Sequence, residues 1–259
     1  ARKTVTASTI GSKVLFIVAD PAGWTSLKNH PELGLGTRIQ LMEYKGVSQL
    51  EALGEAFDED NKAVREFDTV LIDTLSHIAS MDLSVVQKQK IAKKPEFDFE
   101  RDMFPVYNQN AMRIRNALQK LLSAPINVIA TAHSKEYEIK QFGQPTGNFV
   151  VRPKFNPEIF SEVNANFSMI AYMSAKVQVD RQGNVDYKCE TQFHPTQTIV
   201  AKTRIGGLPV VANNPNIKEI VENWVASGAQ LISNEEAEII RPSDQGIQKE
   251  ELHLTSFDL

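Results

Sequence analysis

Short apolar runs recur along the first half of the chain, separated by intervals long enough for a helix. Three of them predict strands buried on both faces of a sheet, because they are short, continuous and apolar: residues 13–19, 70–73 and 126–132. Residues 38–44 form a further segment with spaced apolar side chains between the first two. We expect the three runs to be parallel strands of one sheet.

Helices are predicted in the intervals between these runs. Residues 47–57, 75–90 and 106–123 predict helices, the last with apolar side chains at helical spacing, and a shorter helix is expected just before the strand at residue 70. The stretch 92–105 is charged and predicts a loop. Strands that alternate with helices predict an α/β fold with a mostly parallel sheet flanked by helices.

The pattern changes after His133. The remaining predicted elements are strands at 136–142 and 148–154, a helix at 156–164, an antiparallel hairpin of 167–180 with 185–193, a strand at 198–204 and a helix at 217–227. Residues 1–232 are therefore expected to form one domain with an antiparallel extension. Residues 233–259 are polar and acid-rich, and predict a flexible tail that could dock a protein partner.

Composition narrows the possible partners and compartments. The 259 residues are 42% hydrophobic and 23% charged with a net charge of -4, so contact with nucleic acid would need a local basic patch. The apolar runs are far shorter than the roughly 20 residues of a membrane span. The single cysteine, Cys189, excludes an internal disulfide framework and fits a reducing cytoplasm.

Three polar residues lie at the ends of the predicted strands or just after them. Asp73 ends one strand, while Asp20 and His133 follow the other two. Open α/β sheets bind ligands at the carboxyl edge, where such residues would gather. Each also has a structural alternative: Asp73 could cap the next helix, Asp20 could initiate a turn before proline, and His133 could be a hydrogen-bonded residue at the strand end.

The first residues match part of a phosphate-binding loop. Lys3 and Thr4 correspond to the final two positions of G-x-x-x-x-G-K-[ST], in which lysine reaches the terminal phosphates and the hydroxyl ligates Mg²⁺. Arg2 stands where the last glycine of the pattern would be. The alternative is a frayed, solvated terminus.

The order of these features resembles the phage-type RecA-like P-loop ATPases, grouped with Sak-type recombinases and annealing proteins. The segments that carry the resemblance are Lys3-Thr4, residues 14–20, 69–74 and 128–133, and Ala201-Lys202-Thr203-Arg204. The resemblance implies a RecA-like core that binds ATP and Mg²⁺ and assembles as a ring or filament. It also implies action on single-stranded DNA in phage recombination, hence in the host cytoplasm.

The resemblance assigns a role to each candidate residue. Arg2, Lys3 and Thr4 are implied to bind nucleotide, with Thr4 and Asp73 at the Mg²⁺ ion. Asp20 falls where such enzymes have a catalytic glutamate that polarises water, although its side chain is one methylene shorter.

The resemblance places the remaining catalytic candidates later in the chain. His133 falls at the γ-phosphate sensor position. Lys202 and Arg204 match a Lys-x-Arg pair presented across a subunit interface; alternatively they lie on a solvated edge. A different class of function also fits, a non-hydrolysing scaffold with a degenerate phosphate loop.

A basic, aromatic-dotted stretch is the candidate DNA contact. Cations would follow phosphates while aromatic rings stack on bases. Its residues are Lys88, Lys90, Lys93, Lys94, Phe97, Phe99 and Arg101, followed by Phe104. Acidic residues interleave with them, so a solvated loop is the alternative.

Overall fold

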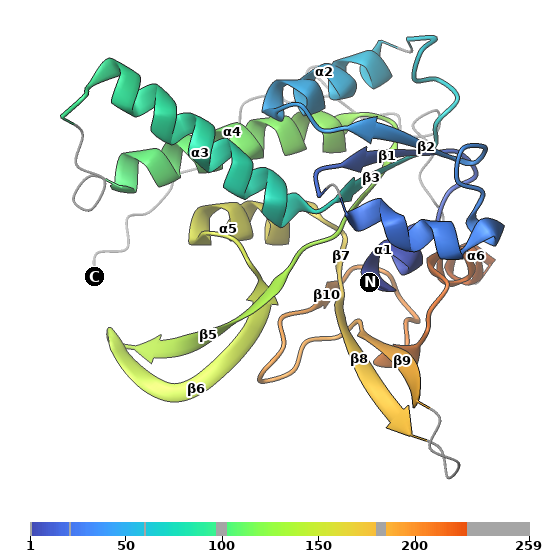
Figure 1. The fold of residues 1–259 in the computed structure, drawn as a ribbon. Helices are drawn as coiled ribbons and strands as arrows, with labels where there is room; N and C mark the ends of the chain where they lie inside the picture. The colour runs from blue at the N-terminus through green and yellow to red at the C-terminus, as the bar shows by residue number, and fades with distance from the viewer. Residues whose placement is uncertain (1, 21, 60, 97–102, 180–184, 227–259) are drawn as a thin grey trace, which may run out of the picture. The chain divides into compact units, whose positions relative to one another are not determined.

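The computed structural model describes residues 2–20, 22–59, 61–96, 103–179 and 185–226 (Figure 1). The chain divides into a compact unit of residues 1–229 and a second unit of residues 230–259. All described residues belong to the first unit, so the predicted tail at 233–259 lies outside them.

A four-stranded parallel sheet forms the centre of this unit, in the order β2-β1-β3-β4. Its strands are β1 (Val14–Val18), β2 (Ile39–Glu43), β3 (Thr69–Asp73) and β4 (Asn127–Ala130). The central strands are in register from Val14 opposite Thr69 to Val18 opposite Asp73. Every residue of β3 is buried, as expected for a strand covered on both faces. The predicted α/β fold is confirmed.

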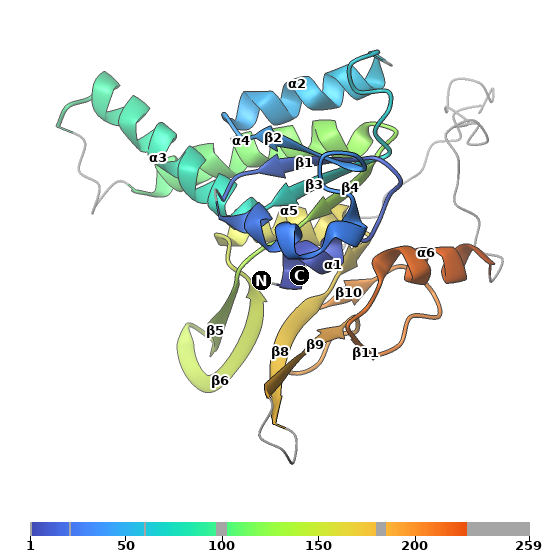
Figure 2. The same cartoon turned by 45° about the vertical axis from the view of Figure 1, so that its right-hand side comes forward.

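Helices cover both faces of the sheet. On one face lie α2 (Val47–Asp58), α3 (Leu75–Lys93), α4 (Met103–Ser123) and α5 (Pro157–Asn166); on the other lie α1 (Arg2–Ala7) and the 3₁₀ helices η1 (Gly23–Asn29) and η2 (Pro31–Leu33) (Figures 1 and 2). The core divides accordingly. Leu15 and Ile17 pack in the larger cluster with α2 and α4, whereas Val14 and Phe16 pack in the smaller one. Successive side chains of β1 therefore pack alternately into the two clusters, one on each face of the sheet.

The antiparallel part follows β4. It contains the hairpin β5 (Ser134–Gln141) with β6 (Gln144–Pro153), the three-stranded sheet β11 (Val211–Asn213), β9 (Val185–Gln192) and β8 (Tyr172–Val179), the short pair β7 (Met169–Ile170) with β10 (Lys202–Thr203), and α6 (Ile217–Ala226). The expected hairpin of β8 with β9 is confirmed, and the strands expected at 136–142 and 148–154 pair with each other as a second hairpin. Within the described residues, none of the helices is long and apolar enough to cross a membrane.

Three local predictions were wrong. The short helix before β3 is a series of turns, in which Asn61 accepts from the backbone of Ala63 through its side chain and of Val64 through its carbonyl. Such local bonds compete with a helix. The strand at 198–204 reduces to β10 and one bridge. Helix α4 begins inside the predicted loop, with Pro105 in its first turn, where proline is tolerated.

Helices α2 and α4 make an unusually close approach at Gly54. A Cβ atom built on Gly54 would lie 2.8 Å from the backbone carbonyl of Lys120. The contact involves rigid backbone, so a larger residue requires the helices to separate. Gly54 thus sets the spacing of the layer that covers β1 and β3.

We predict that Gly54→Ala destabilises the protein. An exposed helical glycine replaced by alanine normally gains about 0.5–1 kcal/mol, but overpacking here should reverse the sign and cost about 1–3 kcal/mol. Chemical denaturation measures the free energy of unfolding. Gly206→Ala is the control, because a Cβ atom added at Gly206 would have nothing within 4 Å. A more stable Gly54→Ala variant would contradict the close packing.

Candidate functional site

The carboxyl ends of β1, β3 and β4 bring the candidate residues to one edge of the sheet. The registers set Val18 opposite Asp73 and Ile72 opposite Ala130. Asp20 therefore follows β1 beside Asp73, and its backbone N–H donates to the Asp73 carbonyl at 3.2 Å. His133 lies three residues past the end of β4.

The carboxylate of Asp73 is buried and held from two sides. It is 2% exposed; Oδ2 accepts a hydrogen bond from Thr4 Oγ1 at 2.6 Å, and Oδ1 accepts one from Thr131 Oγ1. A buried carboxylate needs such donors, because loss of hydration is otherwise costly. The alternative role as a helix cap is wrong: Thr74 caps α3, its side chain accepting from His77 N.

Helix α1 carries Lys3 and Thr4 to the same edge. Lys3 Nζ donates to the Ala132 carbonyl at 2.7 Å, and Thr4 is buried against Asp73. Burial lowers the pKa of Lys3, while the negative charge of Asp73 acts in the opposite direction. The frayed-terminus alternative is therefore wrong for this pair. Arg2 begins the same helix.

Asp20 lies in a turn that closes over Asp73. Its Oδ1 accepts from Ala22 N at 3.0 Å, and its carbonyl accepts from Gly23 N. A Cβ atom on Gly23 would lie 3.0 Å from Asp73 Oδ2, so this backbone approach favours glycine. The turn role of Asp20 is observed. It leaves the other carboxylate oxygen of Asp20 without a partner among the described hydrogen bonds.

His133 connects the sheet edge to the β5–β6 hairpin. Its N–H donates to Ser76 Oγ at 3.1 Å, and its carbonyl accepts from Lys154 N at 2.7 Å. Burial lowers the pKa of His133, followed by the positive charges of Lys3 and Lys154; the negative charges of Asp20 and Asp73 oppose the shift. The neutral imidazole is favoured at neutral pH.

The oxygen donors at this edge fit a magnesium ion bound with a nucleotide. Thr4 and Asp73 offer a hydroxyl and a carboxylate, and Asp20 lies beside them, which is the hard-oxygen chemistry that Mg²⁺ prefers. In the described part of the chain, no three His, Cys, Asp or Glu side chains form a metal cage. Mg²⁺ usually takes one or two carboxylates and completes its shell with water and substrate phosphates.

Lys202 and Arg204 lie elsewhere, at the carboxyl end of α5. Lys202 Nζ donates to the carbonyls of Asn164 and Ala165, and Arg204 Nη2 donates to Ala165 O at 3.0 Å. Cations are favoured at a helix carboxyl end. The two side chains point the same way, as their spacing predicts. None of their described contacts joins them to Lys3, Asp73 or His133.

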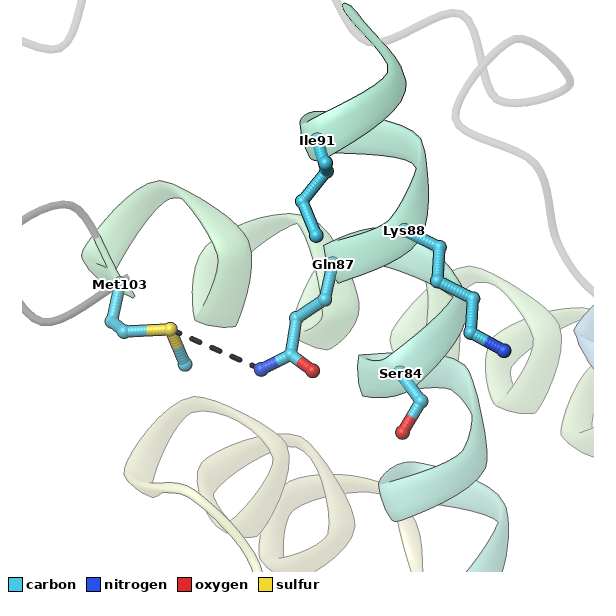
Figure 3. Close-up of a pocket in the computed structure, with 5 residues that line it drawn as sticks. All are labelled: Ser84, Gln87, Lys88, Ile91 and Met103. Atoms are coloured by element: carbon cyan, nitrogen blue, oxygen red, sulfur yellow. Dashed lines mark hydrogen bonds between the residues drawn. The ribbon is translucent and has the colours of Figure 1, made fainter. Parts of the chain in front are cut away.

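The candidate DNA residues lie on and beyond the end of α3. Lys88, Lys90 and Lys93 belong to α3 and Lys94 is its C-cap, whereas Phe97, Phe99 and Arg101 lie outside the described residues. In Figure 3, Lys88 lines a hollow with Ser84, Gln87, Ile91 and Met103, and its ammonium points away from Met103. Gln87 Nε2 contacts Met103 Sδ at 3.9 Å across it. Among the described residues that line the hollow, none carries a carboxylate or belongs to the phosphate loop.

Thr131 is the residue that sequence reasoning missed. It follows β4 directly, is 7% exposed, and supplies the second hydroxyl to Asp73. The predicted strand at 126–132 placed Thr131 inside the strand, whereas β4 ends at Ala130. A hydroxyl immediately after a buried strand lies at the edge where neighbouring strands end.

Comparison with protein families assigns most of the chain to a family model. A family model described as an AAA domain matches residues 3–205. The matched range begins at Lys3, covers the whole parallel sheet, and ends one residue after Arg204. No curated protein matches the chain.

Proposed function

Because the chain belongs to the AAA domain family, whose members are P-loop ATPases, we propose that it binds ATP with Mg²⁺ at the carboxyl edge of β1, β3 and β4 and hydrolyses it. The observation that carries this proposal is that Thr4 donates a hydrogen bond to Asp73, 69 residues away, while the neighbouring Lys3 donates to the Ala132 carbonyl at the same edge. Phosphoryl transfer depends on positioning and charge neutralisation, and this set of side chains provides both.

Each residue at the edge then has a defined task. Lys3 is close enough to Asp73 for the negative charge of Asp73 to oppose the lowering of the lysine pKa by burial. Its ammonium carries three donors, of which the Ala132 carbonyl uses one, so it can also donate to the phosphates. Thr4 can keep donating to Asp73 while its oxygen lone pairs face the cation. Bound Mg²⁺ would neutralise phosphate charge.

Asp20 and His133 flank this centre. The oxygen of Asp20 that the turn does not use is available to orient the attacking water. His133 lies three residues past the end of the adjacent strand β4, where a neutral imidazole could donate to a terminal phosphate. The rival function, a non-hydrolysing scaffold, would share the fold without this turnover.

We further propose assembly with a nucleotide site shared between subunits, acting on single-stranded DNA. Lys202 and Arg204 lie outside the site of their own chain, which supports a role toward a neighbouring subunit. The lysines at the end of α3 are exposed or half-buried and could contact phosphates. A role in phage recombination, a cytoplasmic location and a partner for the tail remain predictions.

ATP binding and hydrolysis by point variants test the function. Lys3→Ala should weaken ATP binding, Asp73→Asn should abolish its Mg²⁺ dependence, and Asp20→Asn should lower kcat with little change in affinity, because an amide cannot polarise water as a carboxylate does. Lys13→Ala is the control: Lys13 precedes β1 at the opposite edge and pairs with Glu66 at 3.3 Å. Hydrolysis that survives all three site substitutions would contradict the proposal, and a wild type that binds ATP without turnover would favour the scaffold.

Mixing inactive subunits tests the shared site. Arg204→Ala and Lys3→Ala subunits should together regain activity that neither has alone, because each supplies the part that the other lacks. A cation provided in trans is worth roughly 10³–10⁵ in rate in well-studied NTPases. Steady-state ATPase rates across mixing ratios measure the rescue. No rescue at any ratio would count against a shared site.

A further inference from the structure

The β5–β6 hairpin is a long ribbon that extends away from the parallel sheet (Figures 1 and 2). Its strands are joined by Phe142 and Gly143, whose φ values of 52° and 79° are both positive, as a two-residue type I′ turn requires. The turn and a bulge between Glu138 and Lys140 fix the register. That register determines which side chains share a face.

Near the start of β5, before the bulge, the charged residues are separated by face. Lys135 lies directly opposite Arg152, and Tyr137 opposite Val150, so these residues share one face. Glu136 and Glu138 alternate with them and lie on the other face, with Val151 and Phe149 opposite. Two cations therefore oppose each other without an acid on their side of the ribbon.

Two like charges in a directly opposed cross-strand pair are destabilising unless something compensates them. No carboxylate of the described residues lies within 4.0 Å of Lys135 Nζ or of the Arg152 guanidinium. Aromatic rings give partial compensation. Arg152 lies over Tyr137 at 4.0 Å and over Phe160 at 4.6 Å, and Lys135 lies 5.5 Å from the same Tyr137 ring.

The end of the ribbon that carries Lys135 and Arg152 is anchored to the larger core. Tyr137 donates its hydroxyl to the Phe155 carbonyl at 3.1 Å, and Phe155 is buried in the larger core. Phe160 belongs to α5 and packs against that core. The rings occupy the faces of the guanidinium and leave its N–H edge for an acceptor, and among the described hydrogen bonds none uses those donors. A cation fixed before its ligand arrives loses little entropy on binding.

We propose that Lys135 and Arg152 form a phosphate-binding site for the backbone of a single nucleic-acid strand. A guanidinium and an adjacent ammonium match a phosphodiester oxygen pair. An exposed ring lies at the tip of the ribbon, where Phe142 is 98% exposed, and such a ring can stack on an unpaired base. The site is two residues beyond His133 along the chain, and it rests on the nucleic-acid part of the proposed function.

The test is the salt dependence of oligothymidylate binding by the full chain. Lys135→Gln and Arg152→Gln should each weaken binding and make the log–log salt slope shallower by roughly 0.7, the value for one lost phosphate contact on a single strand. Arg152→Lys should keep most of the slope, because it keeps the charge. Lys13→Gln is the matched control, with the same change in charge at the opposite edge of the sheet.

Further arms separate the alternatives. Unchanged slopes for Lys135→Gln and for a folded Arg152→Gln would overturn the site, even if the wild type binds the strand and hydrolyses ATP. Inorganic phosphate that binds the wild type and is lost in both variants, while their strand affinity and salt slope stay unchanged, would assign the site to free phosphate and overturn the strand proposal. A wild type that hydrolyses ATP but binds no strand would overturn this site and the DNA role together, while leaving the ATPase.

Discussion

The buried carboxylate of Asp73 is the point at which the separate parts of this protein meet. Thr4 from α1 binds one of its oxygens and Thr131 from the end of β4 binds the other, while its backbone carbonyl accepts from Ala19 and Asp20 after β1. Hydrogen bonds to charged groups contribute about 1.5–3 kcal/mol each, and a buried charge without them costs more. The same contacts that make Asp73 tolerable inside the protein also position the residues proposed to bind ATP.

The segment 131–133 extends this connection toward the ribbon. Thr131 contacts Asp73, the Ala132 carbonyl accepts from Lys3, and the His133 carbonyl accepts from Lys154, the residue that follows β6. Three consecutive residues thus touch the proposed metal ligand, the proposed phosphate ligand and the proposed strand-binding element. A shift of Lys3 from the Ala132 carbonyl to a phosphate would change the hydrogen bonding of this segment.

The sequence alone was sufficient to predict the features of the fold that depend on strand order and on the periodicity of apolar residues. Parallel strands end at a common edge, so Asp20, Asp73 and His133 could be brought together from the apolar runs alone. Thr131 was missed because its contact depends on the register of β4 against β3, which an apolar run does not specify. Likewise, the opposition of Lys135 and Arg152 follows from a turn and a bulge several residues away. The helix predicted before β3 was wrong because of a contact that the apolar pattern does not reveal: the Asn61 side chain accepts a backbone hydrogen bond from Ala63.

The most direct test of the proposed site is the affinity of Mn²⁺, a paramagnetic substitute for Mg²⁺, in the presence of a non-hydrolysable ATP analogue, followed by electron paramagnetic resonance. Thr4→Val removes the hydroxyl with little change in shape, and Thr4→Ser retains it. We predict that the nucleotide-dependent Mn²⁺ signal is lost in Thr4→Val and kept in Thr4→Ser. Equal nucleotide-dependent Mn²⁺ binding by both variants and the wild type would contradict a metal–nucleotide site at Thr4 and Asp73.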